Sequence, residues 1–599
     1  MKCKIQPQKY KQYNRALLKS IIPNSQALSL FRICFALLLL FDLFSYTLPF
    51  REFVYSAQGI FTAHEDYNYT TNGISFFSYS DNIIYQNILF TAYFLALMGI
   101  LIGIRTRTCC LIAYLIFISL MDRTPAVNSN IEVLMAAFLF WSCFMPLDRY
   151  WSWNAAMREP EPDNADHMKW PIIPLVAMKL QIVVVYMHSG LFKLSSGDWT
   201  SGVALKYVVR DEYYGNALGL GAIDLLPDNV LHVSTWAIII FQLLFSFLVY
   251  FPVKNNFFRA LALLGASIMH IGFAIFLQVG LFPYLCATYL ILLIPDQWLN
   301  GLLKKRRKRL SNIHVYYDAD CGFCKATARL FGSFCLGPAA IIEPSYANKT
   351  ADGLLKKHTS WVVMSPDKHY LKWEAVSFVL KQSPIFWIFG FLTDIAFIKP
   401  LMAKVYDSIG KNRHKLSKVF GSLLRKQVEH WPDVTQQTLC LICAVLMLAY
   451  TTMTIPQSPI VPPKSLYSFL AQLKLSQKWD LFAPNIASYD REFKISMTDK
   501  SGQDIDLLPI LTQLYTQDEY GYKHFSTHKI LRYFDALLRK NNPRHRLGFA
   551  RYICNKTQNQ NPDIVTMKIY FRHKFRKDDY YISNMVFSCD DIVTKGVSR

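Results

Sequence analysis

The chain has 599 residues, of which 52% are hydrophobic and 15% aromatic, and its formal net charge is +22. This length and apolar content exclude a single soluble domain. The charge does not indicate a nucleic-acid-binding protein, because no recognition motif accompanies it and many of the basic residues flank apolar segments, where they set membrane topology.

Eight apolar segments follow a polar, basic stretch at residues 1–24. Segments of this composition are typical of transmembrane helices, although several are short. They are Leu28–Leu48, Ile83–Ile104, Cys109–Met121, Ile131–Leu147, Pro171–Gly190, Thr235–Phe251, Phe257–Leu277 and Leu281–Ile294. A ninth, Leu439–Ile455, stands alone further along the chain. We therefore expect a polytopic α-helical membrane domain over residues 25–300 and an extra transmembrane helix at 438–456.

Basic residues predict the orientation of these helices, because cytoplasmic loops carry the excess of Lys and Arg. With a cytoplasmic N-terminal segment, the basic loops all fall on the cytoplasmic side: Arg105/Arg107, Arg149/Arg158, Lys254/Arg259 and Lys304–Arg309. The long segments Pro49–Asn82 and Leu191–Ser234 then fall on the outer side. Counting eight spans before the basic linker at 301–310 places this linker and a domain at 311–425 in the cytoplasm. The ninth span then places residues 457–599 outside the cytoplasm.

Ionisable side chains within or beside the spans come to a similar depth, in the outer half of the predicted bundle. They are Asp42, Glu132, His188, Lys193 and His270. Charged groups in a bilayer are costly and usually face a cavity or a partner, so we expect a polar pocket there. Each residue also has a simpler explanation, since a span-end Glu or Lys often reaches the interface and a lone His is often a hydrogen-bonded core residue. Lys193 is the sharpest candidate, because desolvation among apolar neighbours would favour a neutral amine, which is a usable base.

The region from about residue 24 to residue 300 resembles the HTTM domain, the membrane domain shared with vitamin K-dependent gamma-carboxylases. The resemblance is carried by LFRICFALLLLFD, FMPLDRYWSW, VVYMHSGLFKLSSGDWTSG and MHIGFAIFLQVGLFPY. It implies that Lys193 is a base acting on a reduced quinone, of a vitamin K-like or ubiquinone type. It also implies that Asp198, Trp199 and Gly202 shape the site.

The chain departs from the carboxylase pattern at several places. Phe192 stands where the carboxylase has another lysine, an extra residue precedes Asp198, and the stretch NSNIEVL lacks the histidine that the carboxylase has near there. The large luminal portion by which a carboxylase recognises its substrate is not recognisable either. The resemblance therefore implies a pocket of lipid-quinone size with a base more strongly than it implies glutamate carboxylation.

A strand, a turn, a CxxC pair and a helix are predicted after the membrane domain. His314–Tyr317 is the strand, Asp318–Asp320 ends it, and Cys321 and Cys324 fall in the first turn of the helix. Free N–H groups and the helix dipole stabilise a thiolate there, and the second cysteine can resolve a mixed disulfide, so we expect redox chemistry. A zinc site is disfavoured because no second Cys or His pair has suitable spacing, and a pair of inert buried cysteines is the remaining alternative.

The segment YYDADCGFC resembles the signature of the DCC thiol–disulfide oxidoreductase family, in which an aspartate-containing turn precedes the CxxC. The resemblance continues through SWVVMSPDKHYLKWEAVSFVL and VYDSIGKNRHKLS to about Val419. It implies a thioredoxin-like α/β domain in which Cys321 and Cys324 exchange electrons with protein or small-molecule thiols. Asp318 and Asp320 would support the turn.

The C-terminal part of the chain is expected to form an α+β domain. Phe493–Met497 and Val565–Arg572 alternate apolar and polar residues, as half-buried strands do, and His528–Lys540 is typical of a short helix. Cys554 and Cys589 are its only cysteines. An oxidising compartment would favour a disulfide between them, and two free thiols are the alternative. The segment KLSQKWDLFAPN is similar to one that follows the extra span in bacterial proteins joining HTTM and DCC domains.

Together these features predict an integral-membrane oxidoreductase of a bacterial inner membrane, with a cytoplasmic CxxC site and a quinone pocket. The expected partners are membrane lipid, the quinone and thiols, and neither nucleic acid nor a metal ion is expected. Two other functions stay open. One is a carboxylase-type enzyme that modifies an exported peptide, and the other is a non-enzymatic membrane scaffold or redox sensor.

Overall fold

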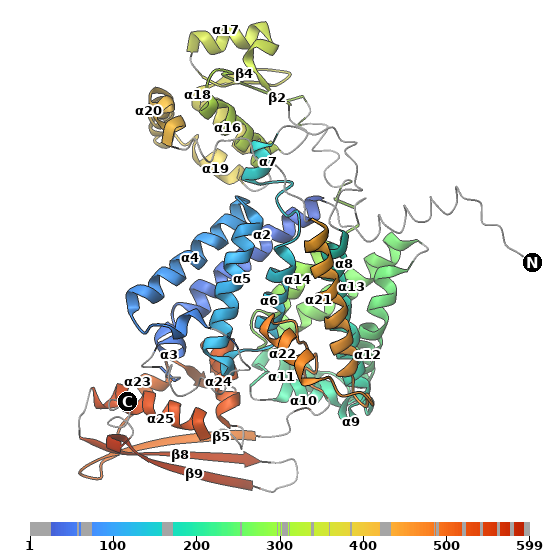
Figure 1. The fold of residues 1–599 in the computed structure, drawn as a ribbon, viewed down its shortest axis with the longest axis vertical. Coiled ribbons are helices and arrows are strands. Elements are labelled where there is room, and N and C mark those ends of the chain that lie inside the picture. The colour runs from blue at the N-terminus through green and yellow to red at the C-terminus, as the bar shows by residue number, and fades with distance from the viewer. Residues whose placement is uncertain are drawn as a thin grey trace, which may run out of the picture.

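The computed structural model is a bundle of apolar helices with a smaller unit at either end (Figure 1). It describes residues 25–591 except 57–58, 61–72, 74, 159–171, 212, 252–253, 296–297, 300, 302–309, 311, 337–340, 359, 384–385, 420–432, 484–485, 487–489, 518–522, 539–542, 560–562 and 575–579. The predicted N-terminal cytoplasmic segment and the basic run Lys304–Arg309 lie outside the described residues.

Among the described residues, six helices are long and apolar enough to cross a membrane. They are α2 (Ser25–Phe41) with its π-helical continuation η1 (Asp42–Thr47), α4 (Ile83–Ile102), α8 (Ile172–Leu194), α12 (Asp228–Tyr250), α13 (Asn255–Phe276) and α21 (Val434–Met453). Each of them overlaps a predicted span. The isolated span α21 packs against α8, so it belongs to the same bundle.

The other three predicted spans are shorter or more polar helices of the same bundle. They are α5 (Thr106–Arg123), α6 (Asn130–Ser142) and α14 (Phe282–Leu290), which the 3-10 turn η5 (Ile291–Leu293) extends. α6 is buried along nearly its whole length and contacts α5, α8 and α14. A short helix is tolerated at this position because neighbouring helices, rather than lipid, surround it.

Local sequence signals explain where these helices begin and end. Ser129 caps α6, and the Glu132 carboxylate accepts the Ser129 backbone N–H at 2.7 Å, which completes a capping box. Asn82 caps α4, and α4 ends at Gly103 with φ of 80°. A Cβ atom at Gly103 would lie 1.9 Å from Nη1 of Arg32, so both the backbone conformation and the close approach require glycine.

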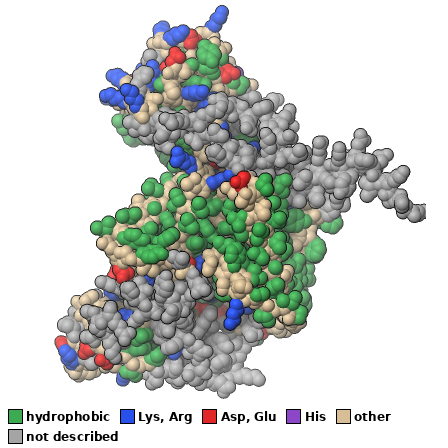
Figure 2. Space-filling view, viewed as in Figure 1, with side chains coloured by type: hydrophobic (Ala, Val, Ile, Leu, Met, Phe, Trp, Pro, Cys, Tyr) green, Lys and Arg blue, Asp and Glu red, His purple; other side chains and the backbone are tan. Residues whose placement is uncertain are grey.

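Large apolar side chains cover the outside of the bundle, as the space-filling view shows (Figure 2). Those exposed on its helices include Leu37, Ile88, Leu95, Leu115, Ile240, Phe247, Leu264, Ile268 and Val445. An apolar surface of this extent is unfavourable in water and matches the hydrocarbon core of a bilayer. The bundle is therefore the membrane domain.

A four-stranded mixed sheet lies at one end of the bundle, with strand order β2-β1-β3-β4. β1 (His314–Tyr317) pairs parallel with β2 (Ile341–Pro344) and antiparallel with β3 (Val362–Met364), which pairs with β4 (His369–Leu371). The helices of this unit are α16 (Gly322–Phe331), α17 (Lys349–His358), α18 (Lys372–Gln382), α19 (Trp387–Leu392) and α20 (Ile398–Val419). The small mixed sheet with helices around it confirms the predicted thioredoxin-like domain.

The short helix α7 (Trp153–Met157) joins this unit to the bundle. The backbone N–H of Asn154 donates to the carbonyl of Gly103 at 3.1 Å, and this contact ties α7 to the turn between α4 and α5. Met157 packs in one apolar cluster with Ala326 of α16. The basic α4–α5 turn therefore lies at the same end of the bundle as the thioredoxin-like unit.

The C-terminal part of the chain forms an α+β unit at the opposite end, as predicted (Figure 1). Its antiparallel sheet has the order β5-β8-β9, with β5 (Asp490–Asp499), β8 (Ile564–Lys574) and β9 (Tyr580–Ser588). A two-stranded sheet joins β6 (Tyr515–Gln517) to β7 (Lys523–Phe525). The helices are α22 (Lys464–Gln472), α23 (Leu508–Leu511), α24 (His528–Leu538) and α25 (Pro543–Gln558).

Short helices from the two long loops of the membrane domain lie at the end of the bundle that carries the C-terminal unit (Figure 1). They are α3 (Arg51–Tyr55), α9 (Gly197–Thr200), α10 (Ala204–Arg210) and α11 (Ala217–Leu225). The loops that the charge pattern assigns to the outer side thus share an end with the C-terminal unit. The thioredoxin-like unit is at the other end. Which end faces the cytoplasm stays a prediction.

Candidate functional site

The CxxC pair lies at the start of α16, in the thioredoxin-like unit. β1 ends at Tyr317, and in the turn that follows the Asp320 backbone N–H donates to Oδ1 of Asp318 at 3.1 Å. Cys321 is the N-cap of α16, and its Sγ accepts the backbone N–H of Cys324 at 3.4 Å. Both cysteines are free thiols. The turn therefore presents the pair at a helix N-terminus.

Arg413, on α20, belongs to this site, and the sequence reasoning missed it. Its Nη1 donates to Oδ2 of Asp318 at 3.0 Å and lies 3.9 Å from Sγ of Cys324. Burial and the neighbouring Cys321 raise the pKa of the Cys324 thiol to about 12, and the Arg413 guanidinium acts in the opposite direction. The signal that could have pointed to Arg413 is its place within VYDSIGKNRHKLS, the last segment of the family resemblance.

A cavity of about 160 Å³ adjoins Cys324. Cys324, Asp318 and Arg413 line it, whereas Cys321 does not. The other walls are mostly aromatic and aliphatic: Phe323, Phe331, Leu355, Trp361, Trp373, Val376, Val405, Tyr406 and Ile409. One cysteine of the pair therefore faces a cavity of apolar character that is edged by a cation.

Four of the five ionisable residues predicted to share one membrane pocket are divided between two places. Lys193 and His270 line a large cavity in the bundle. Asp42 and Glu132 lie instead where the C-terminal unit meets the bundle, each paired with a residue of α24. The two pairs of side chains therefore serve different contacts.

One ion pair and one histidine–carboxylate contact join α24 to the membrane domain. Nζ of Lys529 lies 2.9 Å from Oδ2 of Asp42, and Nε2 of His528 lies 2.6 Å from Oε1 of Glu132. None of the four residues is more than 7% exposed. A buried carboxylate is costly unless a partner compensates its charge, so α24 supplies what the bundle lacks. The sequence reasoning missed both partners, and His528 meets Glu132 in the stretch NSNIEVL, which lacks a histidine of its own.

Asp42, Glu132 and His528 also bring three metal-ligand atoms within 4.8 Å of one another. However, the Lys529 ammonium already lies on Asp42 and also donates to Oγ1 of Thr47 at 2.6 Å. It supplies the positive charge that a metal ion would supply. The arrangement is therefore an ion-paired seam between two units rather than a metal centre.

His188 attaches the segment after α22 to α8. Its Nδ1 accepts the backbone N–H of Trp479 at 3.0 Å, and its Nε2 lies 3.3 Å from Oγ1 of Thr454. Trp479, Leu481 and Phe482 then line the large cavity of the bundle. His188 thus positions one wall of that cavity and does not itself line it.

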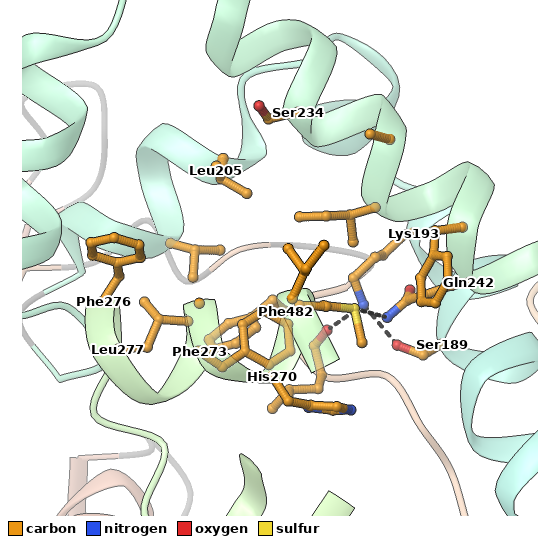
Figure 3. Close-up of a pocket in the computed structure, with 18 of the residues that line it drawn as sticks. Ser189, Lys193, Leu205, Ser234, Gln242, His270, Phe273, Phe276, Leu277 and Phe482 are labelled. Atoms are coloured by element: carbon orange, nitrogen blue, oxygen red, sulfur yellow. Dashed lines mark hydrogen bonds between the residues drawn. The ribbon is translucent and has the colours of Figure 1, made fainter. Parts of the chain in front are cut away.

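The large cavity has a volume of about 580 Å³ and lies among α8, α12 and α13, closed on one side by the segment at 479–482. Lys193, Ser189 and Gln242 lie at one end of it, and Phe276 and Leu277 lie at the other (Figure 3). Most of the remaining wall is aliphatic or aromatic. The cavity therefore has one polar end and a long apolar body, as small-molecule sites commonly do.

Lys193 is held at the polar end of the cavity by neutral groups. Its Nζ donates to Oγ of Ser189 at 2.7 Å and to the carbonyl of Leu481 at 3.4 Å, and it lies 4.9 Å from the centre of the Trp199 ring. The Trp199 indole N–H in turn donates to the carbonyl of Phe482 at 2.7 Å. Among the described residues, no carboxylate pairs with Lys193, in contrast to Lys529.

The remaining predicted residues support this cavity from its edges. Nε2 of His270 lies 2.7 Å from the hydroxyl oxygen of Tyr186, so the imidazole is anchored in the wall. Asp198 lies in α9, is partly exposed and does not line the cavity. Gly202 follows α9 with φ of 78°, and a Cβ atom there would lie 2.0 Å from Nδ1 of His232. Gly202 therefore shapes the turn beside the cavity.

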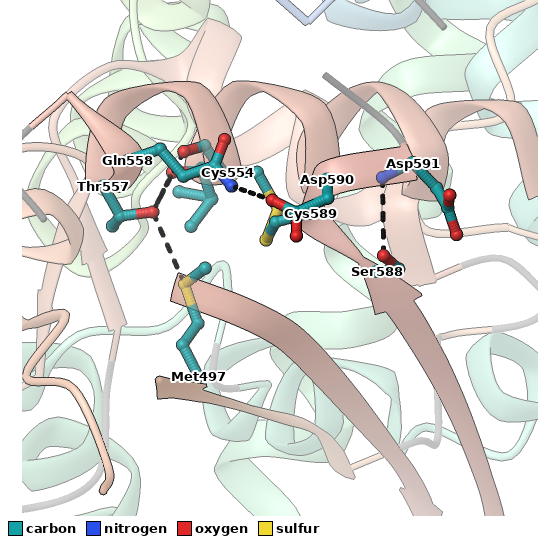
Figure 4. Close-up of a disulfide and its surroundings, with 9 residues drawn as sticks. Met497, Cys554, Thr557, Gln558, Ser588, Cys589, Asp590 and Asp591 are labelled. Carbon is teal, nitrogen blue, oxygen red and sulfur yellow. Dashed lines mark hydrogen bonds between the residues drawn. A yellow bond between two sulfur atoms is a disulfide. The ribbon is translucent and has the colours of Figure 1, made fainter. Parts of the chain in front are cut away.

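A disulfide holds the C-terminal unit together. Cys554 of α25 is bonded to Cys589, which directly follows β9, with an S–S distance of 2.11 Å (Figure 4). Both residues are fully buried, and Nε2 of Gln558 donates to Oδ1 of Asp590 at 3.1 Å beside them. The bond ties the end of the sheet to the helix that covers it.

Replacing both cysteines, in the variant Cys554→Ala/Cys589→Ala, is expected to lower the free energy of unfolding of this unit by about 4 kcal/mol, from the chain entropy of a loop of this length. The loop closed by the bond spans 35 residues. The effect is measured by heating the detergent-solubilised protein and monitoring the unfolding of the C-terminal unit by limited proteolysis. Cys440→Ala, which removes a buried thiol without a disulfide, is the control. Equal proteolysis of both variants would contradict the assignment.

Two family models match the chain. The HTTM domain matches residues 23–298, and the DCC1-like thiol-disulfide oxidoreductase matches residues 315–419. These matches confirm both resemblances and their order along the chain.

Two curated proteins of Bacillus subtilis (strain 168) are similar to parts of the chain. Uncharacterized protein YitO is 24% identical over 199 residues, which cover 33% of this chain and 63% of YitO. Sporulation-delaying protein SdpB is 24% identical over 175 residues, which cover 29% of this chain and 53% of SdpB. The chain thus spans between half and two thirds of the length of these relatives. No solved structure matches.

Proposed function

Because this chain joins an HTTM domain to a DCC1-like thiol–disulfide oxidoreductase domain, we propose that it is a membrane oxidoreductase. In this proposal the CxxC pair of the DCC1-like domain carries out thiol–disulfide exchange. The cavity of the HTTM domain binds a quinone, and Lys193 is its base.

The observation that carries the quinone assignment is the large cavity of the bundle. Its apolar body suits a lipid-soluble ring compound, and its volume of about 580 Å³ lies within the range of small-molecule sites. Two of its lining residues, Leu226 and Ile268, are 44% and 63% exposed on the outside of the protein. The cavity therefore reaches the apolar outer surface, from which a molecule dissolved in the bilayer can enter.

The polar end of the cavity offers the groups that a quinone ring requires. Lys193, Ser189 and Gln242 can hydrogen-bond to a ring oxygen. Apolar walls exclude water from Lys193, and only neutral groups hold it, which favours its neutral amine. In that form it takes a proton from the hydroxyl of a reduced quinone.

The charge pattern supports a cytoplasmic position for the DCC1-like domain. The basic α4–α5 turn lies at the same end of the bundle as this domain, and basic loops are retained in the cytoplasm. The segment 479–482 lines the polar end of the quinone cavity. This segment comes from the C-terminal part of the chain, whose folded unit lies at the other end of the bundle from the DCC1-like domain. The two sites therefore serve different partners, thiols on one face of the membrane and a lipid-soluble quinone near the other.

Filling the cavity tests this proposal. Gly272 on α13 lines the cavity and has open space where a Cβ atom would lie, so Gly272→Trp is expected to occupy the cavity without disturbing the helix. Quinone extracted from the purified wild-type protein and measured by mass spectrometry should fall by about tenfold or more in this variant.

Gly221→Trp is the matched control, because Gly221 also has open space around it but does not line the cavity. This variant should retain the wild-type amount of quinone. The proposal fails if wild-type protein from quinone-containing membranes carries no quinone, or if Gly272→Trp carries as much as the control.

A further inference from the structure

We propose that the DCC1-like domain docks on a lipid surface that carries anionic headgroups, through an apolar patch on α19 and the start of α20. The patch consists of large side chains that are between 47% and 76% exposed: Trp387, Ile388, Phe389, Phe391, Phe397 and Leu401. This inference depends neither on thiol–disulfide exchange nor on quinone binding. It gives the domain an attachment to the membrane in addition to α7.

The side of α19 that faces its own domain is small and polar, whereas its outer side is aromatic. Gly390 is buried against α18, and a Cβ atom there would lie 2.7 Å from the backbone nitrogen of Lys381. The Ser377 hydroxyl lies 3.2 Å from the carbonyl oxygen of Gly390 and donates to Oδ1 of Asp394 at 2.9 Å. A surface helix of a soluble domain has the reverse arrangement, with its apolar side turned to the core. The outer face of α19 therefore suits an apolar environment better than water.

The patch lies beside the membrane. Figure 1 shows α19 at the edge of the domain nearest the bundle and α17 at the edge farthest from it. The outside of the bundle is covered by apolar side chains and is therefore surrounded by the bilayer. The headgroups at this end of the bundle lie next to α19. The patch thus continues the lipid-facing surface of the membrane domain.

The charge of α20 fits anionic headgroups. Ile398–Val419 contains five lysines, one arginine and one aspartate. Lys404 and Lys411 are exposed, and their spacing from Leu401 places all three on one side of the helix. A basic helix with aromatic and aliphatic side chains beside its charges is typical of a helix that lies on a membrane surface. Tryptophan, here Trp387, also prefers the boundary between lipid and water.

A second copy of the chain would cover the apolar side chains but would not suit the basic helix. A two-fold interface brings the same surface of each copy together, so the lysines of α20 would face one another. Like charges in contact are unfavourable. A lipid surface with anionic headgroups satisfies the apolar and the basic features together.

Photocrosslinking identifies what covers the patch. The full-length protein is placed in vesicles of phosphatidylcholine and phosphatidylglycerol in equal parts, with p-benzoylphenylalanine in place of Phe389. The matched control has the same group in place of Tyr346, which is 74% exposed and lies in η7 (Ser345–Ala347), packed against α17. Mass spectrometry after irradiation should find phospholipid on position 389 at least about tenfold more often than on position 346, because transfer of one aromatic side chain from water to an apolar phase is favourable by at least that factor.

Two results would overturn the proposal. A second copy of the chain joined to position 389 would show that the patch is an interface between copies. As little phospholipid on position 389 as on position 346 would show that the patch stays in water.

Two carboxylates on the patch test whether its apolar character is what docks. Ile388→Glu/Phe397→Glu should lower the yield of phospholipid on position 389 by at least about tenfold, since charged side chains are costly in an apolar phase. Both positions are exposed, so the fold of the domain does not depend on them. Tyr346→Glu, at an exposed site on the far edge, should leave the yield unchanged. Equal yields in these two variants would contradict docking through the patch.

The lipid found on position 389 tests the role of the basic helix. Phosphatidylglycerol should exceed phosphatidylcholine by about fivefold, because anionic headgroups attract each nearby lysine. Lys404→Gln/Lys411→Gln should bring the two lipids close to equal amounts. Lys349→Gln/Lys357→Gln, which changes two exposed lysines of α17, should keep the excess. Equal amounts of both lipids without these substitutions would overturn the preference for anionic headgroups.

Discussion

Lys529→Met is expected to lower the free energy of local opening of α24 by about 3–5 kcal/mol, because it leaves a buried carboxylate without its partner. Asp42 and Lys529 are 2% and 3% exposed and lie 2.9 Å apart, with Thr47 as a second partner of the ammonium. Burial alone would lower the pKa of Lys529, but Asp42 and neighbouring groups raise it above its ordinary value, so the ammonium is charged at neutral pH. Hydrogen–deuterium exchange across α24 measures the opening directly.

An exposed ion pair between the same two units provides the control. Lys556 of α25 lies 2.7 Å from Glu52 of α3, and their side chains are 39% and 60% exposed. Lys556→Met should therefore change the opening of its helix by no more than about 1 kcal/mol. The double variant Asp42→Asn/Lys529→Met should recover most of the lost stability, because no uncompensated charge remains. If Lys529→Met behaved like Lys556→Met, the buried pair would not be holding the units together.

Lys193→Met is expected to slow oxidation of the bound reduced quinone by a factor of about 10² to 10⁴, the contribution typical of a general base. Methionine keeps the apolar stem and fills similar space, so quinone binding should persist. The measurement is stopped-flow oxidation of the quinol by an artificial electron acceptor, with the amount of bound quinone determined on the same samples.

Two further variants separate the base from the charge. Lys193→Arg retains a positive charge but has no accessible neutral form, so it should be as slow as Lys193→Met. Lys206→Met removes a lysine from an exposed pair with Asp228 and should keep the wild-type rate. A wild-type rate in Lys193→Arg would show that the positive charge matters and that proton removal by this residue does not.

The features that the sequence predicts well are those with a local or periodic origin. Six predicted spans correspond to long apolar helices, because about 20 apolar residues in a row have few other stable environments. The CxxC turn could be predicted because a short run of β-branched and aromatic residues is followed by an Asp-rich break and then by a helical pattern. The short helix predicted at His528–Lys540 is α24, which is described up to Leu538, while residues 539 and 540 lie outside the described residues.

The partners of the site residues could not be predicted, because packing and not local sequence brings them together. Glu132 meets His528 across 396 residues, and Asp318 meets Arg413 across 95. Lys193 receives its wall and a carbonyl partner from Leu481, 288 residues later. The charge pattern predicts that Asp42 and Lys193 lie at a similar depth in the membrane, but side chains at equal depth can face different neighbours, as these two do.

The seam between α24 and the bundle has a consequence for how the protein is made. Glu132 leaves the ribosome about 20–80 s before His528 does, at ordinary elongation rates over the 396 residues between them. Throughout that interval Asp42 and Glu132 lack their partners Lys529 and His528, which have not yet been synthesised. The contacts between α24 and the helix bundle must therefore form last. A nascent chain arrested before α24 would lack these contacts and would be exposed to membrane proteases and quality control.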